Sequence, residues 1–508
     1  MDENVIDPHT DEQELTEVLR IRKAKLQKLQ EDKRDPFEIT KFDRTAYSSQ
    51  VRENFETMEN ENVSMAGRVM AKREMGKAVF LDIIDDKGRI QLYIKLNDVG
   101  DESFNDIKKG DIGDIIGVTG FVFKTKMGEI SIHCKTVTLL AKSLHPLPEK
   151  YHGLTNQELR YRKRYVDLIM NPETRTVFET RSAFIKHVRE FLDGRGYMEV
   201  ETPVLNTISG GATARPFITR HNTLGLDMYM RIATELHLKR LIVGGIERVY
   251  EIGRIFRNEG MDTKHNPEFT TVELYEAYTD FRAMMDLAED LLSSAAYKLF
   301  GGYSLPWQGE KVNLAPGWPR MTMADAVREY TGVDFMSFDS AEEAVNAAAT
   351  IGVKTPDGKE PSWGTLLYEC FDQRVEDELI QPVFITEYPI EVSPLAKKKA
   401  ADPRLTERFE LFICRNEIAN AFSEINDPID QKQRFQRQAA LRSAGDLEAC
   451  MMDDDFINAL EYGMPPTGGM GIGIDRCVMM LTNNSSIRDV LLFPTMKPEQ
   501  TRTDNTEI

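Results

Sequence analysis

The sequence predicts an α+β protein in which a helix and a small β-barrel precede a larger domain of strands and helices. Three patterns point to this fold class. An amphipathic helix opens the chain, and short alternating strands fill residues 61–140. The remainder mixes strands and helices without the strand–helix–strand repeat of a parallel sheet, which favours α+β over a doubly wound fold.

Length and charge limit the classes of protein that fit. At about 150 residues per domain, 508 residues suggest roughly three domains. The 64 Lys and Arg against 83 Asp and Glu give a net charge of −19, which argues against nonspecific binding of nucleic acid over the whole surface but allows a local basic footprint. No long apolar run and no secretory signal occur, so we expect no membrane partner. Five scattered cysteines disfavour disulfides and a zinc site, and a cytoplasmic location is expected.

The first helix is predicted over about residues 11–32 and ends before Asp35-Pro36. One face is apolar, and the other carries a row of basic side chains: Arg20, Arg22, Lys23, Lys25, Lys28, Lys33 and Arg34. This row has two interpretations, a solvated face or a strip that contacts nucleic-acid phosphates. The sequence leaves both open.

Residues 61–140 have the pattern of a small barrel. Strands are predicted at 63–69, 79–84, 89–94, 115–124 and 129–133, with no long helix among them. About five strands in eighty residues favour the oligonucleotide-binding (OB) barrel. A Pro-rich stretch and a basic stretch follow, which indicates a linker. The expected segments are a helical extension at 1–59, the barrel at 60–145, the linker at 146–172 and the large domain at 173–508.

The large domain begins with a predicted helix at 173–193, followed by an extended segment at 197–205. Residues 249–278 then form a strand, a polar loop and a second strand. Alternation places Phe269, Glu273 and Tyr275 on one face of the second strand, and Arg257 with Glu259 on one face of the first. Gathering these charges on one surface is costly unless that surface binds something charged. The alternative is a solvated hairpin rim.

A glycine-rich segment, residues 465–476, ends in Asp475-Arg476 at the start of an apolar helix. Its spacing is not that of a P-loop. The glycines would let a ligand lie close to the backbone, and Arg476 would offer a planar cation to phosphate. The alternative is a tight turn with a structural arginine.

Residues 408–424 bring candidate metal ligands. Alternation sets Asn420, Phe422 and Glu424 on one face, while Glu410 and Glu417 are paired carboxylates suited to Mg²⁺ held alongside phosphates. Strict alternation would put Glu417 opposite Asn420, so a shared site requires a bulge or turn between them. The alternative is a half-exposed strand with solvated acids.

Taken together, these segments resemble the class II aminoacyl-tRNA synthetases. FRNE with HNPEF is similar to motif 2, GIGIDR to motif 3, and residues 196–203 to motif 1 of that class. The details resemble the bacterial lysyl-tRNA synthetases in order along nearly the whole chain, through GGATARPF, ELHLKRL, TEYPIEVSPLAKK, EIANAFSEIND, MPPTGGMGIGIDR and the barrel segments KAVFLD, GRIQLYI and KTKMGEISIHC. The resemblance implies an antiparallel catalytic sheet flanked by helices, with a subdomain inserted within about 282–404.

The implied reaction is activation of L-lysine by ATP and transfer of lysine to the 3′ end of tRNA(Lys). The substrate carboxylate is itself the nucleophile, so catalysis consists of positioning and charge neutralisation. Arg257 and Arg476 would be the catalytic cations. The implied ATP-binding residues are Arg257, Glu259, His265, Asn266, Phe269, Glu410, Glu417, Gly473 and Arg476. Glu410 and Glu417 would bind Mg²⁺, with up to three ions per subunit alongside ATP.

The resemblance also assigns the lysine site. Its residues would be Gly211, Glu235, Arg257, Glu273, Tyr275, Asn420, Phe422 and Glu424. Glu424 and Tyr275 would take the side-chain ammonium and Glu235 the α-amino group. A buried carboxylate left unpaired costs several kcal/mol by order of magnitude, so this pocket would reject uncharged isosteres. The interpretation requires that Arg257 and Arg476 lie close together and that no basic side chain of the protein fills the slot.

On the barrel, Phe80, Gln91 and Glu129 match residues that recognise the lysine anticodon, by stacking and by hydrogen bonds to base edges. Phe80 could instead belong to the barrel core. Pro203 would lie at a homodimer interface, as in the family.

Two other functions remain for comparison. A synthetase paralogue that attaches a lysine-like amino acid to a protein such as elongation factor P would lack the barrel, which this chain keeps. An inactive RNA-binding or regulatory protein would not need the full set of charged residues in the three motifs.

Overall fold

The computed structural model describes residues 8–148, 154–338, 340–354, 361–445 and 448–499, with side chains from residue 15 onward. The chain divides into two compact units, residues 1–153 and 154–508, and each is described by itself. The α+β class predicted from the sequence is confirmed in both.

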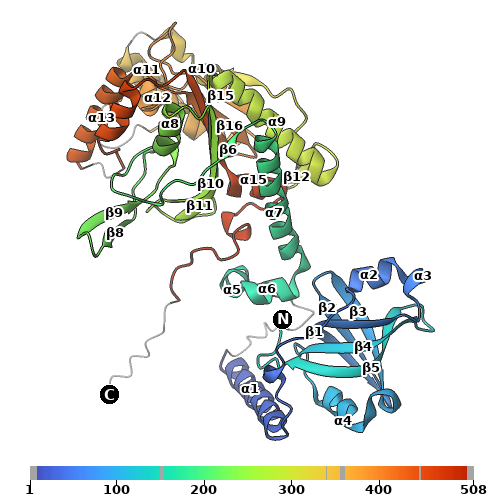
Figure 1. Cartoon of the computed structure of the whole chain (residues 1–508). Coiled ribbons are helices and arrows are strands. Elements are labelled where there is room, and N and C mark those ends of the chain that lie inside the picture. The colour runs from blue at the N-terminus through green and yellow to red at the C-terminus, as the bar shows by residue number, and fades with distance from the viewer. Residues whose placement is uncertain (1–7, 149–153, 339, 355–360, 446–447, 500–508) are drawn as a thin grey trace. The chain divides into compact units, whose positions relative to one another are not determined.

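The first unit is a closed barrel with helices around it. Its strands are β1 (Asn62–Met75), β2 (Ala78–Asp85), β3 (Gly88–Lys95), β4 (Ile115–Lys124) and β5 (Ile130–Ala141), in the order β1-β2-β3-β5-β4 with β4 closing on β1 (Figure 1). The helices are α1 (Pro8–Glu31), α2 (Ser48–Glu53), α3 (Phe55–Met58) and α4 (Leu96–Lys109). Alternate residues of the strands fill the barrel, as Val79, Leu81 and Ile83 do on β2. The five predicted strands are confirmed.

The prediction that no long helix interrupts the barrel strands is wrong. Helix α4 spans 14 residues between β3 and β4. The helix has few apolar residues, and of these only Phe104 is buried. Gly100, with φ 84°, interrupts the helical dihedral angles. A short amphipathic pattern interrupted by glycine and rich in Asp, Asn and Lys is typical of a loop when only the sequence is considered.

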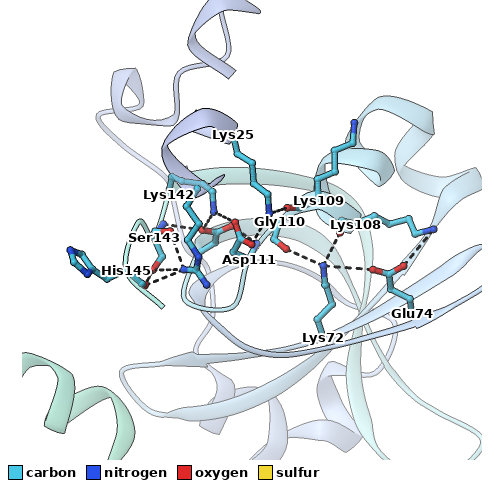
Figure 2. Close-up of polar contacts among 12 residues, drawn as sticks. Lys25, Lys72, Glu74, Lys108, Lys109, Gly110, Asp111, Lys142, Ser143 and His145 are labelled. Atoms are coloured by element: carbon cyan, nitrogen blue, oxygen red, sulfur yellow. Dashed lines mark hydrogen bonds and ion pairs between the residues drawn. The ribbon is translucent and has the colours of Figure 1, made fainter. Parts of the chain in front are cut away.

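The basic face of α1 is neither uniformly solvated nor uniformly available for phosphates. Arg22 is 7% exposed and donates to the carbonyl oxygens of Ser143 and His145, both at 3.1 Å. Lys25 reaches the Asp111 carboxylate at 2.7 Å, and Lys142 reaches the same carboxylate at 2.6 Å (Figure 2). These basic side chains therefore fasten the helix to the barrel. The two interpretations left open by the sequence, a solvated face or a phosphate-contacting strip, apply only to the exposed positions, among them Lys23, Lys28 and Lys33.

The second unit is built on an eight-stranded sheet in the order β14-β15-β16-β17-β18-β11-β10-β6. The strands are β6 (Met198–Glu199), β10 (Arg248–Phe256), β11 (Glu268–Ala277), β14 (Arg320–Thr322), β15 (Val383–Thr386), β16 (Arg408–Ile413), β17 (Asn416–Ser423) and β18 (Thr467–Gly473). The six central strands are antiparallel, as expected, whereas β14 pairs in parallel with β15 and β6 in parallel with β10 at the edges. Smaller sheets are formed by β7 (Leu205–Asn206), β8 (Ile218–His221) and β9 (Leu226–Met230), and by β12 (Ser304–Trp307) with β13 (Glu310–Asn313).

Helices cover the sheet unequally. The helices of this unit are α5 (Gln157–Arg162), α6 (Arg164–Met170), α7 (Pro172–Asp193), α8 (Glu235–Val243), α9 (Phe281–Phe300), α10 (Met323–Thr331), α11 (Ala341–Thr350), α12 (Trp363–Arg374), α13 (Pro428–Ser443), α14 (Asp454–Glu461) and α15 (Ile474–Leu481). On one face, α7, α9 and α15 pack a large apolar core against the sheet, to which Tyr250, Val272 and Leu274 contribute (Figure 1). The other face carries polar side chains, with α8 and α14 near β10 and β11.

The glycine-rich segment is neither a loop nor a turn. Residues 467–473 form β18, a central strand between β17 and β11. Gly469 shows why glycine is needed, because a Cβ there would lie 2.1 Å from Glu424 Oε1 and 2.5 Å from Tyr275 Cε1. The absence of a side chain at Gly469 leaves room for Glu424, which follows β17, and for Tyr275 of β11.

Residues 282–404 do not form one separate body. Within this range α9 packs on the main core, and β14 and β15 are strands of the main sheet. Helices α10, α11 and α12 surround a second core at that edge, in which Phe335, Phe371 and Tyr388 are buried.

Candidate active site

The polar face of the eight-stranded sheet contains a cavity of about 550 Å³. Every residue that the sequence analysis assigned to ATP or lysine lines it: Gly211, Glu235, Arg257, Glu259, His265, Asn266, Phe269, Glu273, Tyr275, Glu410, Glu417, Asn420, Phe422, Glu424, Gly473 and Arg476. These residues come from separate parts of the chain, and the fold brings them together around one cavity. The contacts of these residues with ligands stay predictions.

The hairpin of β10 and β11 positions one side of the cavity. The two strands pair in register, with Glu251 opposite Glu273 and Ile255 opposite Phe269. Glu273 and Tyr275 therefore face the cavity, while Val272 and Leu274 face the core, as alternation predicted. The first strand ends at Phe256, so Arg257 and Glu259 reach the cavity from the loop rather than from a strand face.

Two guanidinium groups mark the cationic part of the cavity. Arg257 lies 5.2 Å from the centre of the Phe269 ring. Burial lowers its pKa against the opposing charges of Glu259, Glu417 and Glu273, and the charge of Arg476 adds to the lowering. Arg476 donates to the backbone oxygen of Glu417 at 2.8 Å and to the Glu417 carboxylate at 3.2 Å. The two arginines thus lie close enough to repel each other, which is the arrangement expected where a polyanion binds between them.

The two candidate metal ligands lie on paired strands, and the required bulge is present. Leu411 pairs with Ala419 but Phe412 pairs with Glu417, so Ile418 is an extra residue in β17. This extra residue puts Glu417 and Asn420 on the same side of the strand, where both line the cavity.

Glu410 is held by hydrogen bonds from three side chains. The Tyr388 hydroxyl donates to it at 2.8 Å, Arg408 at 2.5 Å and the Asn420 amide at 3.2 Å. Burial, and next the charge of Glu417, raise the pKa of Glu410 to about 7. A buried acid and a partly exposed acid that repel each other form a donor set that suits a hard divalent cation. Among the described residues, no three acidic, His or Cys side chains form a complete metal cage, so such a cation would need further ligands such as phosphate oxygens.

At the other end of the cavity lies a slot between β17, β18 and β11. Glu424 follows β17 and is 1% exposed, and its backbone N–H donates to the Thr467 oxygen at 2.8 Å. Tyr275 and Glu273 of β11 line the slot, and Gly469 of β18, which has no side chain, leaves room between them and Glu424. Glu235 begins α8 at the far wall. Burial, and next the charge of Glu235, raise the pKa of Glu273 to about 7.

Comparison with known proteins decides the family. Residues 156–497 match the family model described as tRNA synthetases class II (D, K and N), and residues 63–140 match an OB-fold nucleic acid binding domain. The chain is 56% identical to the lysine–tRNA ligase of Pelotomaculum thermopropionicum, over 96% of both chains. The chain belongs to the class II lysine–tRNA ligases. It is 57% identical to that of Thermoanaerobacter pseudethanolicus over 96% of this chain and 97% of the relative, and 53% identical to that of Clostridium kluyveri over 97% and 98%.

In this member of the lysine–tRNA ligases, sequence reasoning missed one charged residue of the slot. Lys239 forms ion pairs with both Glu235 and Glu424, and its side chain is 0% exposed. It does not line the cavity, so the slot is not filled by a resident cation. Sequence analysis nevertheless did not foresee that both acids would already share a buried basic partner. The signal was present in ELHLKRL, because Lys239 lies one helical turn after Glu235.

Two further residues of the ligase site were missed. Arg408 donates to Glu410 and, at 2.7 Å, to the backbone oxygen of Val392, and Tyr388 is fully buried beside it. Tyr388 comes from a segment that sequence analysis did not relate to the carboxylate pair, whereas Arg408 opens the segment that contains the pair but was assigned no role. Their hydrogen bonds hold Glu410 in one orientation.

The barrel of this lysine–tRNA ligase presents aromatic side chains. Phe80 is half-buried and lies outside the barrel core, with its ring 5.0 Å from that of Tyr93. Gln91 is buried and accepts from Ser131 at 3.1 Å, and Glu129 pairs with Arg52 at 3.0 Å. Tyr93 in turn contacts Phe123 and His133, which extends the aromatic surface.

The motif 1 segment of the ligase is exposed. Pro203 lies on the surface, and nearby Met198, Leu205 and Ile218 are 54%, 44% and 64% exposed. None of the helices in the described part of the chain combines the length and apolar character needed to cross a lipid bilayer.

Proposed function

We propose that this chain activates L-lysine with ATP and transfers the lysyl group to tRNA(Lys), in the cytoplasm, for protein synthesis. The observation that carries the proposal is the slot between Glu424, Tyr275 and Gly469, which opens into the same cavity as Arg257 and Arg476. A buried carboxylate next to a phenol suits an alkylammonium, and the adjacent guanidinium pair suits a triphosphate.

In the first step, a lysine carboxylate oxygen attacks the α-phosphorus of ATP, the bond from this phosphorus to the bridging oxygen breaks, and pyrophosphate leaves. Arg257 would bridge the carboxylate and the α-phosphate, and Arg476 would hold the γ-phosphate. Phe269 would stack on adenine, with Glu259, His265 and Asn266 around the nucleotide. Holding the two anions together supplies much of the catalysis, because their approach is otherwise opposed by charge.

Glu410 and Glu417 would hold Mg²⁺. The repulsion between the Glu410 and Glu417 carboxylates supports this assignment, since a divalent cation removes it. When bound with ATP, the metal supplies positive charge next to the triphosphate and favours departure of pyrophosphate.

In the second step, the terminal ribose hydroxyl of tRNA attacks the carbonyl carbon of the adenylate, and AMP leaves. The barrel would select the tRNA through Phe80, Gln91 and Glu129. The half-exposed ring of Phe80 beside Tyr93 supports a stacking role. Glu129 would have to leave Arg52, or share it, to contact a base.

A homodimer through motif 1 is part of the proposal. Exposed apolar side chains around Pro203 support it, because surfaces of this kind are typical of interfaces between subunits.

Lysine-dependent exchange of pyrophosphate into ATP tests the first step. Purified protein assayed with each of the common amino acids should support exchange with lysine, and exchange with a different amino acid alone would contradict the proposal. Charging of tRNA(Lys) then tests the second step. A protein that exchanges with lysine but lysylates elongation factor P instead of tRNA would be the paralogue considered above.

A further inference from the structure

Lys239 is a cation buried between two acids that line the lysine slot. Its side chain is 0% exposed, and it forms ion pairs with Glu235 on its own helix and with Glu424 after β17. The centres of the Phe422 and Phe456 rings lie 5.7 Å and 5.9 Å from its Nζ atom. These rings exclude water, so the ammonium depends on the two carboxylates for its stabilisation.

Lys239 stands behind the wall of the slot. Glu235 and Glu424 line the cavity, and Lys239 does not. A ligand in the slot would therefore contact the cavity side of each carboxylate while Lys239 holds the opposite side. A single side chain joins the two groups that would receive the α-amino and side-chain ammonium groups of lysine.

The local electrostatics show what this cation does for its neighbours. Burial raises the pKa of Glu235 and holds that of Glu424 well above its usual value, and the charge of Lys239 opposes this rise in both without cancelling it. Burial lowers the pKa of Lys239, but the two carboxylates outweigh it and the pKa is raised overall. Lys239 thus stays charged, and it favours the ionised form of both acids.

The other titratable groups that face the slot are of two kinds, neutral and charged. Burial raises the pKa of Tyr275 well above its usual value and that of Cys450 to about 11, so both are neutral near pH 7. Glu273 adds a third carboxylate and Arg257 a second cation. With all five groups ionised, the slot carries one net negative charge, and lysine with both amino groups protonated carries one net positive charge.

We propose that Lys239 is a positioning residue that sets lysine specificity, by fixing Glu235 and Glu424 relative to each other and keeping both as carboxylates. The inference rests on the proposed function, because it takes these two acids as the lysine contacts. Without Lys239, the slot would hold an excess of buried negative charge, and Glu424 would bind a proton instead. A neutral Glu424 no longer needs a cation, so the slot would accept uncharged side chains of similar length more readily.

The test compares Lys239→Met with Arg240→Met in the full-length protein. Arg240 is the matched control, because it is the next residue on α8 and pairs with Asp453 and Asp455 rather than with the slot. Exchange assays would measure KM for lysine and for ATP, the pH dependence of kcat/KM for lysine, and exchange with norleucine, which lacks the side-chain ammonium.

For Lys239→Met we expect KM for lysine to rise by at least tenfold, with KM for ATP changed by less than about threefold. The pH at which kcat/KM for lysine is half-maximal should rise by at least about one unit. The ratio of norleucine to lysine exchange should rise as well. Arg240→Met should change none of these. Equal changes in both KM values with an unchanged pH profile would overturn the inference and indicate a structural role.

Two further variants keep the test decisive if Lys239→Met does not fold. Lys239→Gln is also neutral but retains a hydrogen-bond donor, and it should shift the pH profile in the same direction. Lys239→Arg retains the charge, so the wild-type pH profile should persist even if KM for lysine rises; a shifted profile for Lys239→Arg would contradict the inference. Failure of the wild type to exchange with lysine would instead refute the proposed function.

Discussion

Arg181 on α7 and Asp475 on α15 form an ion pair of 2.5 Å. The other oxygen of Asp475 accepts from the backbone N–H of Thr270 on β11 at 2.6 Å. One carboxylate thus joins three elements immediately before Arg476. The position of Arg476 in the cavity depends on this buried link.

Replacing Asp475 with Asn should therefore affect both stability and ATP binding. Removing one partner of a buried ion pair costs about 3–5 kcal/mol, because the other charge is left uncompensated. We expect the free energy of unfolding in urea to fall by about 3 kcal/mol and KM for ATP to rise more than KM for lysine. The double variant Asp475→Asn with Arg181→Met should recover part of the stability. An unchanged urea midpoint for the single variant would contradict the role of the link.

Gly469→Ala should impair lysine binding. The added Cβ would lie 2.1 Å from Glu424 Oε1, so Glu424 and Tyr275 must move away from the positions that form the slot. We expect KM for lysine in the exchange assay to rise at least tenfold. Gly471→Ala on the same strand is the control, because its nearest atom would be Glu273 Cγ at an ordinary 3.7 Å. Similar lysine KM values for the two variants would argue against a specific role for Gly469.

Glu424→Gln should raise KM for lysine far more than KM for ATP. The amide keeps the size of the side chain but removes the charge that pairs with an ammonium, and a loss of about 1.4 kcal/mol corresponds to a tenfold change in affinity. Exchange kinetics at varied lysine and varied ATP separate the two constants. Equal effects on both would count against the assigned contact.

Lysine use should depend on pH near neutrality. Burial, and next the charge of Glu235, raise the pKa of Glu273 to about 7, so this acid is neutral below that pH and ionised above it. Because an ionised Glu273 attracts the cationic substrate, kcat/KM for lysine should rise between about pH 6 and 8. Glu273→Gln should move or remove this inflection, while leaving Arg257 and Glu235 as neighbours of the slot. A pH profile unaltered by the substitution would assign the inflection to another group.

Phe80→Ala should weaken tRNA use without affecting adenylate formation. Stacking of a base on an aromatic ring contributes about 1–3 kcal/mol, so KM for tRNA(Lys) should rise about tenfold or more. Phe80→Tyr retains the ring and should behave like the wild type. Lysine-dependent pyrophosphate exchange needs no tRNA and should be equal in all three proteins. Normal charging by Phe80→Ala would leave the ring without a role in recognition.

Patterns local in sequence predicted much of the fold. Alternation located all five barrel strands and assigned Glu273 and Val272 to opposite faces of β11. The mismatch between Glu417 and Asn420 even predicted a bulge before any pairing was known, and Ile418 provides it. Such features follow from the period of two residues in a strand, which the sequence contains directly.

Features that depend on contacts between segments distant in sequence could not be predicted from local patterns. The glycines of β18 gave no strand signal, because their reason lies in Glu424 and Tyr275 on the neighbouring strands. Helix α4 was missed because a glycine interrupts its short apolar pattern. Lys239 lies one turn after Glu235 on α8, but its second partner, Glu424, is distant in sequence. Ion pairs across elements are set by tertiary packing, which no single-segment pattern encodes.

The extra residue at Ile418 sets the phase of β17. It turns Glu417 toward the same side as Asn420 and Phe422, so one strand brings an acid to the cavity at its start and leads to Glu424, also in the cavity, at its end. A shift of one position in a strand sends each following side chain to the opposite surface. Loss of a single amino acid at this point would therefore turn Glu417 away from the face that carries Asn420, although every cavity residue would still be present in the sequence.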